Sequence, residues 1–238
     1  MFIIRKLVFA LVLLVAVFLG ASVVLESFAE TQLSSGIAKT LDLGSRPNVE
    51  IDAFPIILRV MQGRIPRIVI DAHNVTIQKL DVQELSIELK GVHANLDVLI
   101  RSNQFDLKVE HGVATATVTE DATNAYLKAQ GENAHVTFRP DGSVFVRSDR
   151  VVAGKSHRFE ATGTLAVEAR TLTFTPTKVT VDGGTPPPGL AALARRETTI
   201  SVRIPKLPGN ILPSKVVPSD AQVSLIAVLE NYQLQLNR

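Results

Sequence analysis

Apolar and polar residues follow three different patterns along this chain, and each pattern predicts a different structure. The first pattern runs from Leu7 to Leu25, a segment that contains no charged residue. As an α-helix this segment is about 28 Å long, close to the thickness of about 30 Å of the hydrocarbon core of a bilayer. It therefore predicts one N-terminal transmembrane helix.

Basic residues precede this apolar segment and acidic residues follow it. Arg5 and Lys6 lie before it, and Glu26 and Glu30 lie after it. Because Lys and Arg are retained on the cytoplasmic side, the N-terminus is expected in the cytoplasm and the body in the periplasm or cell envelope. A cleaved signal peptide, with Ser27 and Ala29 near the cleavage site, is the alternative and leads to the same compartment. The chain is thus divided into an anchor or uncleaved signal at residues 1–25 and an extracytoplasmic domain at residues 26–238.

The second pattern is a repeat of apolar residues at every fourth position, which predicts that the helix continues beyond the membrane. It comprises Leu25, Ala29, Leu33, Ile37 and Leu41. Such a spacing places the apolar side chains on one face of a helix. Gly44 and Pro47 are suitable for ending that helix.

The third pattern begins at Val49 and consists of short segments rich in β-branched residues, separated by polar or glycine-containing turns. Apolar and polar residues alternate in these segments, as in strands with one buried face. The predicted strands are Val49–Phe54, Ile65–Ala72, Val75–Leu80, Leu85–Lys90, Phe105–Val109, Val113–Val118, Ala134–Phe138, Val144–Val152, Phe159–Ala169, Leu172–Val181, Thr198–Ile204, Val223–Leu229 and Tyr232–Leu236. Asp141 and Gly142 predict a hairpin turn.

Helices are predicted at three places in this body. Thr119 is a suitable N-cap for a helix that ends at Gly131, and Leu190–Arg196 is a small apolar helix. The segment from Pro55 to Gly63 is predicted to be a short buried helix or a tight corner. Strands do not alternate with helices, which favours an α+β fold with a curved, mostly antiparallel sheet wrapped around helix and an elongated apolar groove.

Composition narrows the range of functions. The chain has 25 basic and 23 acidic residues, and without Arg5 and Lys6 the body is formally neutral. Aromatic residues make up 5% of the chain and tryptophan is absent, so nucleic acid is not an expected partner. The absence of cysteine excludes disulfides, Cys-zinc sites and thiol catalysis.

No recognised catalytic or metal-binding motif occurs in the sequence. The histidines are dispersed at His73, His93, His111, His135 and His157, and Asp52, Asp71 and Asp106 have no spacing that identifies an acid and base pair. We therefore expect no cofactor, no metal and no enzymatic activity.

An apolar segment and nearby arginines are the best candidates for a binding site. We expect Phe54, Pro55, Ile57, Leu58 and Met61 to line or close a lipid cavity, and Arg64 to contact lipid phosphates. Plain core packing and a solvated strand edge, which also carries Arg59 and Arg67, are the alternatives.

Several short motifs occur in the order that one known family shows. They are Asp52-Ala53-Phe54-Pro55-Ile56-Ile57-Leu58, Gly63-Arg64, Val69-Ile70-Asp71-Ala72, Leu85–Leu89 with Lys90-Gly91-Val92, Thr117-Val118-Thr119-Glu120, Tyr126-Leu127 and Val202-Arg203-Ile204-Pro205-Lys206-Leu207-Pro208. In these motifs the chain resembles the LmeA-like phospholipid-binding family of bacterial envelope proteins. Ile56 and Gly209-Asn210-Ile211 depart from the family pattern.

The resemblance implies a membrane-attached extracytoplasmic protein that binds phospholipid and, in mycobacterial-type envelopes, supports the assembly of lipoglycan mannan. It implies no catalytic residues, and it makes phospholipid, the membrane and envelope glycan-assembly proteins the candidate partners. A non-catalytic scaffold for the glycan machinery and an unrecognised hydrolase are the competing functions. A lipid-binding protein requires an apolar groove, whereas a hydrolase requires a polar cluster in a cleft.

Overall fold

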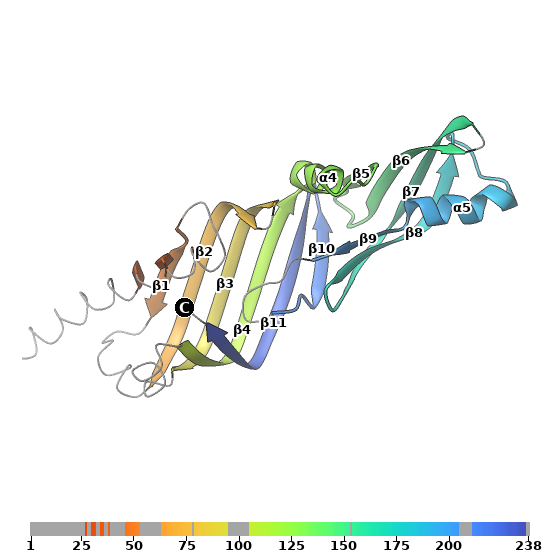
Figure 1. Ribbon diagram of the computed structural model, residues 1–238. Coiled ribbons are helices and arrows are strands. Elements are labelled where there is room, and N and C mark those ends of the chain that lie inside the picture. Colours follow the sequence, from red (N-terminus) through yellow and green to blue (C-terminus); the bar gives the residue numbers. More distant parts are fainter. Residues whose placement is uncertain are drawn as a thin grey trace, which may run out of the picture.

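Two antiparallel sheets, joined by a helix, form most of the molecule (Figure 1). The structure is a computed structural model that describes residues 27, 30, 31, 34, 35, 38, 46–52, 63–77, 79–94, 105–152, 154–204 and 211–236. The predicted transmembrane segment and all but the last residue, Gly63, of the predicted corner from Pro55 to Gly63 lie outside these residues.

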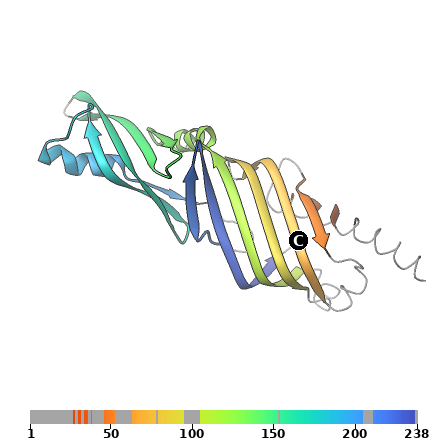
Figure 2. The same ribbon diagram turned by 180° about the vertical axis from the view of Figure 1, so that it is seen from behind.

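The first sheet has six strands in the order β1-β2-β3-β4-β11-β10. Their bounds are Asn48–Asp52 for β1, Arg64–Ile77 for β2, Leu80–Ala94 for β3, Phe105–Thr119 for β4, Gln222–Leu236 for β11 and Lys215–Ser219 for β10. All neighbouring strands are antiparallel. Figure 2 shows this sheet from behind, with β1 and β10 at its two edges.

The second sheet has five strands in the order β5-β6-β7-β8-β9. Their bounds are Ala134–Phe138 for β5, Val144–Val152 for β6, Lys155–Glu168 for β7, Thr171–Val181 for β8 and Ile200–Arg203 for β9. Helix α4, Glu120–Ala129, connects the two sheets, and helix α5, Pro188–Thr198, packs against β6, β7 and β8. The predicted curved, mostly antiparallel α+β architecture is confirmed, as two sheets with α4 between them.

An irregular row crosses four strands of the first sheet. Pro66, Gly91, Glu110 and Asn231 occupy equivalent positions on β2, β3, β4 and β11, and Gly91 and Asn231 have φ of 59° and 48°. We call this row the crease. Each pair of neighbouring strands keeps the same pairing register before and after the crease. Beyond it β4 and β11 turn sharply (Figure 1).

The crease changes which residues face the core. On β3, Leu89 and Val92 are both buried although they are three residues apart. On β4, Val109 and Gly112 are likewise both buried and three residues apart. Strict alternation would place such residues on opposite faces. A similar change occurs at Asn74 in β2, where φ is 52° and Ala72 and Val75 are both buried.

These irregularities explain three errors in the predicted strands. Ile65–Ala72 and most of Val75–Leu80 belong to one strand, β2, and Leu80 begins β3 after a turn at Lys79, where φ is 72°. The segments Phe105–Val109 and Val113–Val118 form the single strand β4, and the predicted final pair forms the single strand β11. Strand β10, which contains Pro218, was not predicted.

Local signals at turns and helix ends gave better predictions. The Thr119 hydroxyl accepts a hydrogen bond from Ala122 N at 3.2 Å, as expected of an N-cap. Gly142 has φ of 78° in the hairpin between β5 and β6, and Gly142 N donates to Arg139 O at 3.0 Å. Thr119 and Gly142 therefore occupy the positions that the sequence predicts.

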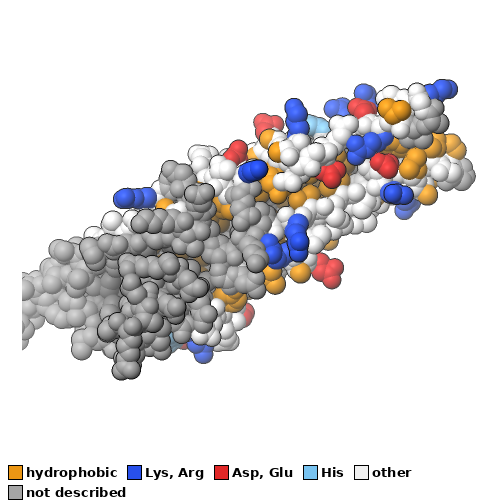
Figure 3. All heavy atoms as spheres, viewed as in Figure 1, with side chains coloured by type: hydrophobic (Ala, Val, Ile, Leu, Met, Phe, Trp, Pro, Cys, Tyr) orange, Lys and Arg blue, Asp and Glu red, His pale blue; other side chains and the backbone are white. Residues whose placement is uncertain are grey.

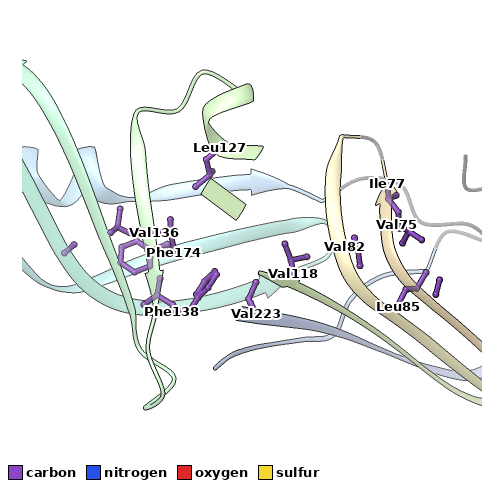
Figure 4. Close-up of a cluster of buried hydrophobic side chains, with 14 residues drawn as sticks. Val75, Ile77, Val82, Leu85, Val118, Leu127, Val136, Phe138, Phe174 and Val223 are labelled. Atoms are coloured by element: carbon purple, nitrogen blue, oxygen red, sulfur yellow. The ribbon is translucent and has the colours of Figure 1, made fainter. Parts of the chain in front are cut away.

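Three clusters of buried apolar side chains follow one another through the molecule. The largest joins the two sheets, with Val75, Val82 and Val118 from the first and Val136 and Phe174 from the second (Figure 4). A second cluster contains buried residues of β1, β2, β3, β4 and β11, and a third lies between the second sheet and α5. The apolar interior thus extends from β1 to α5.

Polar groups of the N-terminal segment hold it against the first sheet. Glu30 Oε1 accepts a hydrogen bond from Ile51 N of edge strand β1 at 3.1 Å. The buried Ser34 hydroxyl donates to Pro47 O at 2.6 Å. The segment that follows the predicted anchor is therefore tied to the edge of the sheet.

Candidate functional site

A pocket lies where the two sheets meet, and residues far apart in the sequence form its walls. Its volume is about 100 Å³. Leu80, Val118, Val223 and Leu225 come from the first sheet, and Thr123, Tyr126 and Leu127 come from α4. The second sheet and the residue after it provide Val136, Phe138, Val144, Val146, Leu165, Leu172, Phe174, Ile200, Val202, Arg203 and Ile204. We call this cavity the junction pocket.

The junction pocket has a buried base and a partly exposed rim. Val144 and Val146 are fully buried, and only 2% of Phe174 is exposed to solvent. Leu80, Leu165, Leu172, Ile200, Val202 and Leu225 are only partly buried. In Figure 3, hydrophobic side chains are visible in a band along this part of the molecule, with charged side chains on both sides. The pocket is therefore an apolar site that reaches the surface.

Helix α4 forms a firmly held wall of the pocket. The Asn124 side chain donates to Val136 O at 2.9 Å and accepts from Val136 N at 2.7 Å. It thus provides hydrogen-bond partners for the backbone of Val136 at the outer edge of β5. Glu120 Oε2 accepts from Phe138 N at 2.9 Å, and Glu120 N donates to Ala221 O at 2.8 Å. Moving α4 away would break these four bonds as well as the packing of buried Leu127.

Strand β9 forms the opposite wall and is held less firmly. Among the described strands it pairs only with β8, over the four residues from Ile200 to Arg203. A backbone bond from Ile204 N to Arg170 O, 2.8 Å, and a bond from the Arg170 guanidinium to Ile204 O, 3.0 Å, close its end. As a short edge strand, β9 is the wall that can move with the least loss of structure.

Few polar residues border the junction pocket. The Thr123 hydroxyl donates to Thr119 O at 2.9 Å and is thus already satisfied. Arg203 follows Val202, whose side chain faces the pocket, so alternation along β9 directs the Arg203 side chain to the other face. Tyr126 presents an aromatic ring with a polar tip, which suits a boundary between apolar and wet surroundings. The pocket is therefore suited to binding an apolar group, and its described lining residues include no pair of a nucleophile and a base.

Of the predicted site residues, Arg64 is the one that the structure describes, and it does not line the junction pocket. Phe54, Pro55, Ile57, Leu58 and Met61 lie outside the described residues, so their assignment stays a prediction. Arg64 lies at the start of β2, whereas the pocket adjoins the other end of that strand. Fourteen residues of extended strand separate those ends by about 40 Å.

The arginines of the predicted phosphate site face carboxylates. Arg64 lies 3.4 Å from Glu110, and Arg67 Nε donates to Glu88 Oε1 at 2.7 Å. The Arg67 bond, with a second from Lys90, lowers the pKa of Glu88. Arg64 and Arg67 thus have protein partners on the exposed face of the sheet.

Three histidines also face single carboxylates. His93 lies 2.8 Å from Glu110, His111 lies 2.6 Å from Glu230, and His157 lies 2.8 Å from Asp182. His73 and His135 are exposed. Among the described residues, no group of three or more His, Asp or Glu side chains could hold a metal ion. His93, His111 and His157 therefore contact surface carboxylates, and the described residues form no metal site around them.

The crease carries a pH-sensitive contact that can be measured. The bond with His93 lowers the pKa of Glu110 from its ordinary value of 4.5, and Arg64 lowers it further. The folded state therefore binds fewer protons than the unfolded state, so this contact stabilises the fold above pH 4.5 and is lost as the pH falls through the lowered pKa. Because Glu110 is partly exposed, the effect is expected to be small.

We expect the urea midpoint to fall between about pH 5 and pH 3, and Glu110→Gln to make that fall shallower. The matched control is Glu84→Gln on β3, because exposed Glu84 has no ion pair among the described residues. The two variants would be compared by urea unfolding followed by circular dichroism. An equal fall in wild type and Glu110→Gln would contradict the role of Glu110.

The junction pocket as a whole was not predicted from the sequence, although part of its lining shows a pattern that points to a buried face. Val144 and Val146 alternate on β6, Leu172 and Phe174 on β8, and Ile200, Val202 and Ile204 along β9. Alternation places each set on one face of its strand. The pairing of β8 with β9 brings Leu172 opposite Val202 and Phe174 opposite Ile200, which the sequence could not specify.

The fold and the pocket define a class of protein in which two β-sheets enclose an apolar interior with an opening to the surface. The chain belongs to the LmeA-like phospholipid-binding family, because the model of that family matches residues 20–227. The resemblance in the sequence motifs is thus confirmed. Neither a curated protein nor a solved structure gives a significant match.

The match to the family does not itself show membrane attachment. Within the described part of the chain, no helix is long and apolar enough to cross a bilayer. The anchor predicted at residues 1–25 lies outside that part, and so it stays a prediction.

Proposed function

We propose that this chain is a membrane-anchored extracytoplasmic protein that binds phospholipid by enclosing the end of an acyl chain in the junction pocket. The almost wholly apolar lining of that pocket is the observation that carries the proposal. Membership of a phospholipid-binding family supports lipid as the ligand. The neutral body after the apolar segment supports a globular domain outside the membrane.

The size of the pocket limits how much of a lipid it holds in this conformation. A volume of about 100 Å³ is smaller than the roughly 300–1,000 Å³ of most small-molecule sites. Burying each methylene group contributes about 0.8 kcal/mol, so even four of them contribute about 3 kcal/mol before ordering costs. The headgroup stays outside the apolar pocket, and a longer part of the chain enters only if a wall moves.

Binding of this kind requires no side-chain chemistry, so we propose that the protein is not an enzyme. In the envelope it would support the assembly of lipids or lipoglycan mannan, which is the role that the family resemblance implies. Envelope glycan-assembly proteins remain its candidate partners. No cofactor takes part in this function.

Mass spectrometry of lipid that copurifies with residues 26–238 tests the proposal. This fragment keeps Glu30 and Ser34, whose bonds hold the N-terminal segment to the sheet. We expect a soluble, folded domain that carries phospholipid. A folded domain without lipid would contradict lipid binding and favour the scaffold function.

The absence of catalysis has its own test. Changing each histidine to Gln, and Asp52, Asp71 and Asp106 to Asn, should leave lipid content and cellular complementation largely unchanged. Removing a catalytic acid or base usually lowers a rate by about 10² or more. A variant that stays folded and lipid-loaded but fails to complement would indicate catalysis.

A further inference from the structure

The outer face of the first sheet, which points away from the apolar clusters, carries exposed valines. Val113 on β4 and Val228 on β11 are directly paired, and 44% and 52% of their surface is exposed. They are two of the four exposed large apolar residues of the described chain, with Val151 and Leu212. The water-facing side of an antiparallel sheet normally carries polar residues, so solvation does not account for this pair.

Four rows of paired residues cross the outer face between the crease and the second sheet. They are Asp52, Arg67, Lys90, His111 and Glu230; Glu50, Val69, Glu88, Val113 and Val228; Asn48, Asp71, Ser86, Thr115, Ile226 and Lys215; and His73, Glu84, Thr117, Ser224 and Val217. Four apolar members of these rows lie together on β4, β11 and β10, namely Val113, Val228, Ile226 and Val217. We call them the apolar centre of the face.

Carboxylates outnumber cations in the four rows. The rows contain six Asp or Glu side chains but three Lys or Arg side chains, and five of the six carboxylates lie on β1, β2 and β3. Arg67 and Lys90 both contact the same carboxylate, Glu88, at 2.7 Å and 3.3 Å. The carboxylates of the rows that form no ion pair with a described residue are Glu50, Asp52, Asp71 and Glu84. The face therefore presents an excess of negative charge beside its apolar centre.

The outer face is large enough for a specific protein contact. With strands about 4.8 Å apart and residues about 3.3 Å apart, the four rows cover roughly 650 Å². Specific protein interfaces bury about 600–1,000 Å² on each partner, and they combine an apolar core with a polar rim. The apolar centre and the carboxylates beside it have this arrangement.

We propose that the outer face binds a protein partner whose surface carries apolar side chains beside Lys and Arg side chains. The apolar residues of the partner cover Val113 and Val228, and its cations face the carboxylates of β1, β2 and β3. Charge decides between the possible occupants. The negative surface of a bilayer repels this face, and a second copy of the face carries the same excess of carboxylates. This inference goes beyond lipid binding and does not rest on it.

A photo-reactive residue at Val228 tests the proposal in living cells. The full chain with Val228→p-benzoylphenylalanine replaces the cell's own copy, and irradiation links this residue to the molecule that covers it. The control is Val151→p-benzoylphenylalanine, because Val151 is more exposed, at 74%, but lies on β6 of the second sheet. The cross-linked peptides are identified by mass spectrometry.

We expect a protein adduct at position 228 that does not form at position 151, with Lys or Arg residues beside the cross-linked peptide. Glu50→Lys with Glu84→Lys should lower the yield of this adduct about tenfold or more, because the new cations repel those of the partner. The matched control is Glu132→Lys with Glu168→Lys, since both residues are exposed, lie outside the four rows and form no ion pair with a described residue. This control should leave the yield unchanged.

Circular dichroism and lipid content are measured for every variant. If the Lys pair does not fold, Glu50→Gln with Glu84→Gln replaces it, with an expected loss of yield of about threefold or more. The inference is overturned if a folded chain forms no adduct, forms one only with lipid or with a second copy, or loses yield equally in the control variant. An adduct whose peptide lies away from any Lys or Arg would overturn it too. Retained lipid without the adduct contradicts this inference alone, whereas the adduct without lipid contradicts the proposed function alone.

Discussion

Replacing Leu225 with tryptophan is expected to remove most of the lipid that copurifies with the protein. Leu225 lies on the rim of the junction pocket, and a tryptophan there occupies a cavity of only about 100 Å³. Losing about four buried methylene groups corresponds to about 3 kcal/mol, or a loss of affinity on the order of 10²-fold. Lipid per protein, measured by mass spectrometry, should fall accordingly while the protein remains folded.

The next residue provides a matched control. Ile226 follows Leu225 on β11 but belongs to the opposite face of the sheet, and it is likewise partly buried. Ile226→Trp should therefore keep its lipid, although overpacking at either position costs about 1–3 kcal/mol of stability. Equal loss of lipid in both variants, or wild-type lipid in folded Leu225→Trp, would show that the pocket is not the lipid site.

The sequence predicted local structure well wherever one residue type decides the geometry. Thr119 as an N-cap and Gly142 in a turn needed only the chemistry of their own neighbourhood. The bounds of the long strands were wrong because apolar and polar residues do not alternate strictly along them. At the crease, Gly91 and Asn231 adopt positive φ, so the same face of the strand is reached after three residues instead of two.

The reason why the crease keeps its register is also not local. Gly91 has no side chain, and Glu110 from the neighbouring strand lies over it; a Cβ at Gly91 would collide with the Glu110 side chain. The irregular position on β3 is thus filled by the side chain from the irregular position on β4, and the two strands pair in the same register before and after it. In a single sequence each irregular position is seen alone, and it looks like the end of a strand.

The junction pocket was beyond prediction for a related reason. Its walls come from both sheets and from α4, which the chain brings together only through tertiary packing. The sequence favoured the apolar segment around Leu58 because that segment is contiguous. A contiguous apolar segment can be found in a sequence, whereas a cavity between partly buried residues of several strands depends on their pairing.

A pocket of this size must widen to admit a longer part of an acyl chain, and the wall with the weakest attachments should move. Helix α4 is held by bonds to Val136, Phe138 and Ala221, whereas β9 lies at the edge of its sheet and, among the described strands, pairs only with β8. At the end of β9, Ile204 is held to Arg170 by two hydrogen bonds. Lipid entry is therefore expected to require separation of β9 from β8.

A cross-link between β8 and β9 tests this expectation in a chain that has no cysteine of its own. Thr173 and Ser201 are directly paired, and their hydroxyls lie 3.4 Å apart, so Thr173→Cys with Ser201→Cys can form a disulfide. Lipid exchange with fluorescent vesicles should be slowed about tenfold or more in the oxidised protein and restored by reduction. Such a change corresponds to about 1.4 kcal/mol in the barrier.

The first sheet offers a control of the same chemistry. Thr117 on β4 and Ser224 on β11 are also directly paired, with hydroxyls 3.1 Å apart, and they lie between two strands that have partners along most of their length. Thr117→Cys with Ser224→Cys should leave the exchange rate unchanged, because lipid entry does not separate these strands. If the β8–β9 disulfide formed and exchange remained at the wild-type rate, another wall would have to move. Slowing by both disulfides to the same extent would instead indicate that entry requires a general loosening of the fold.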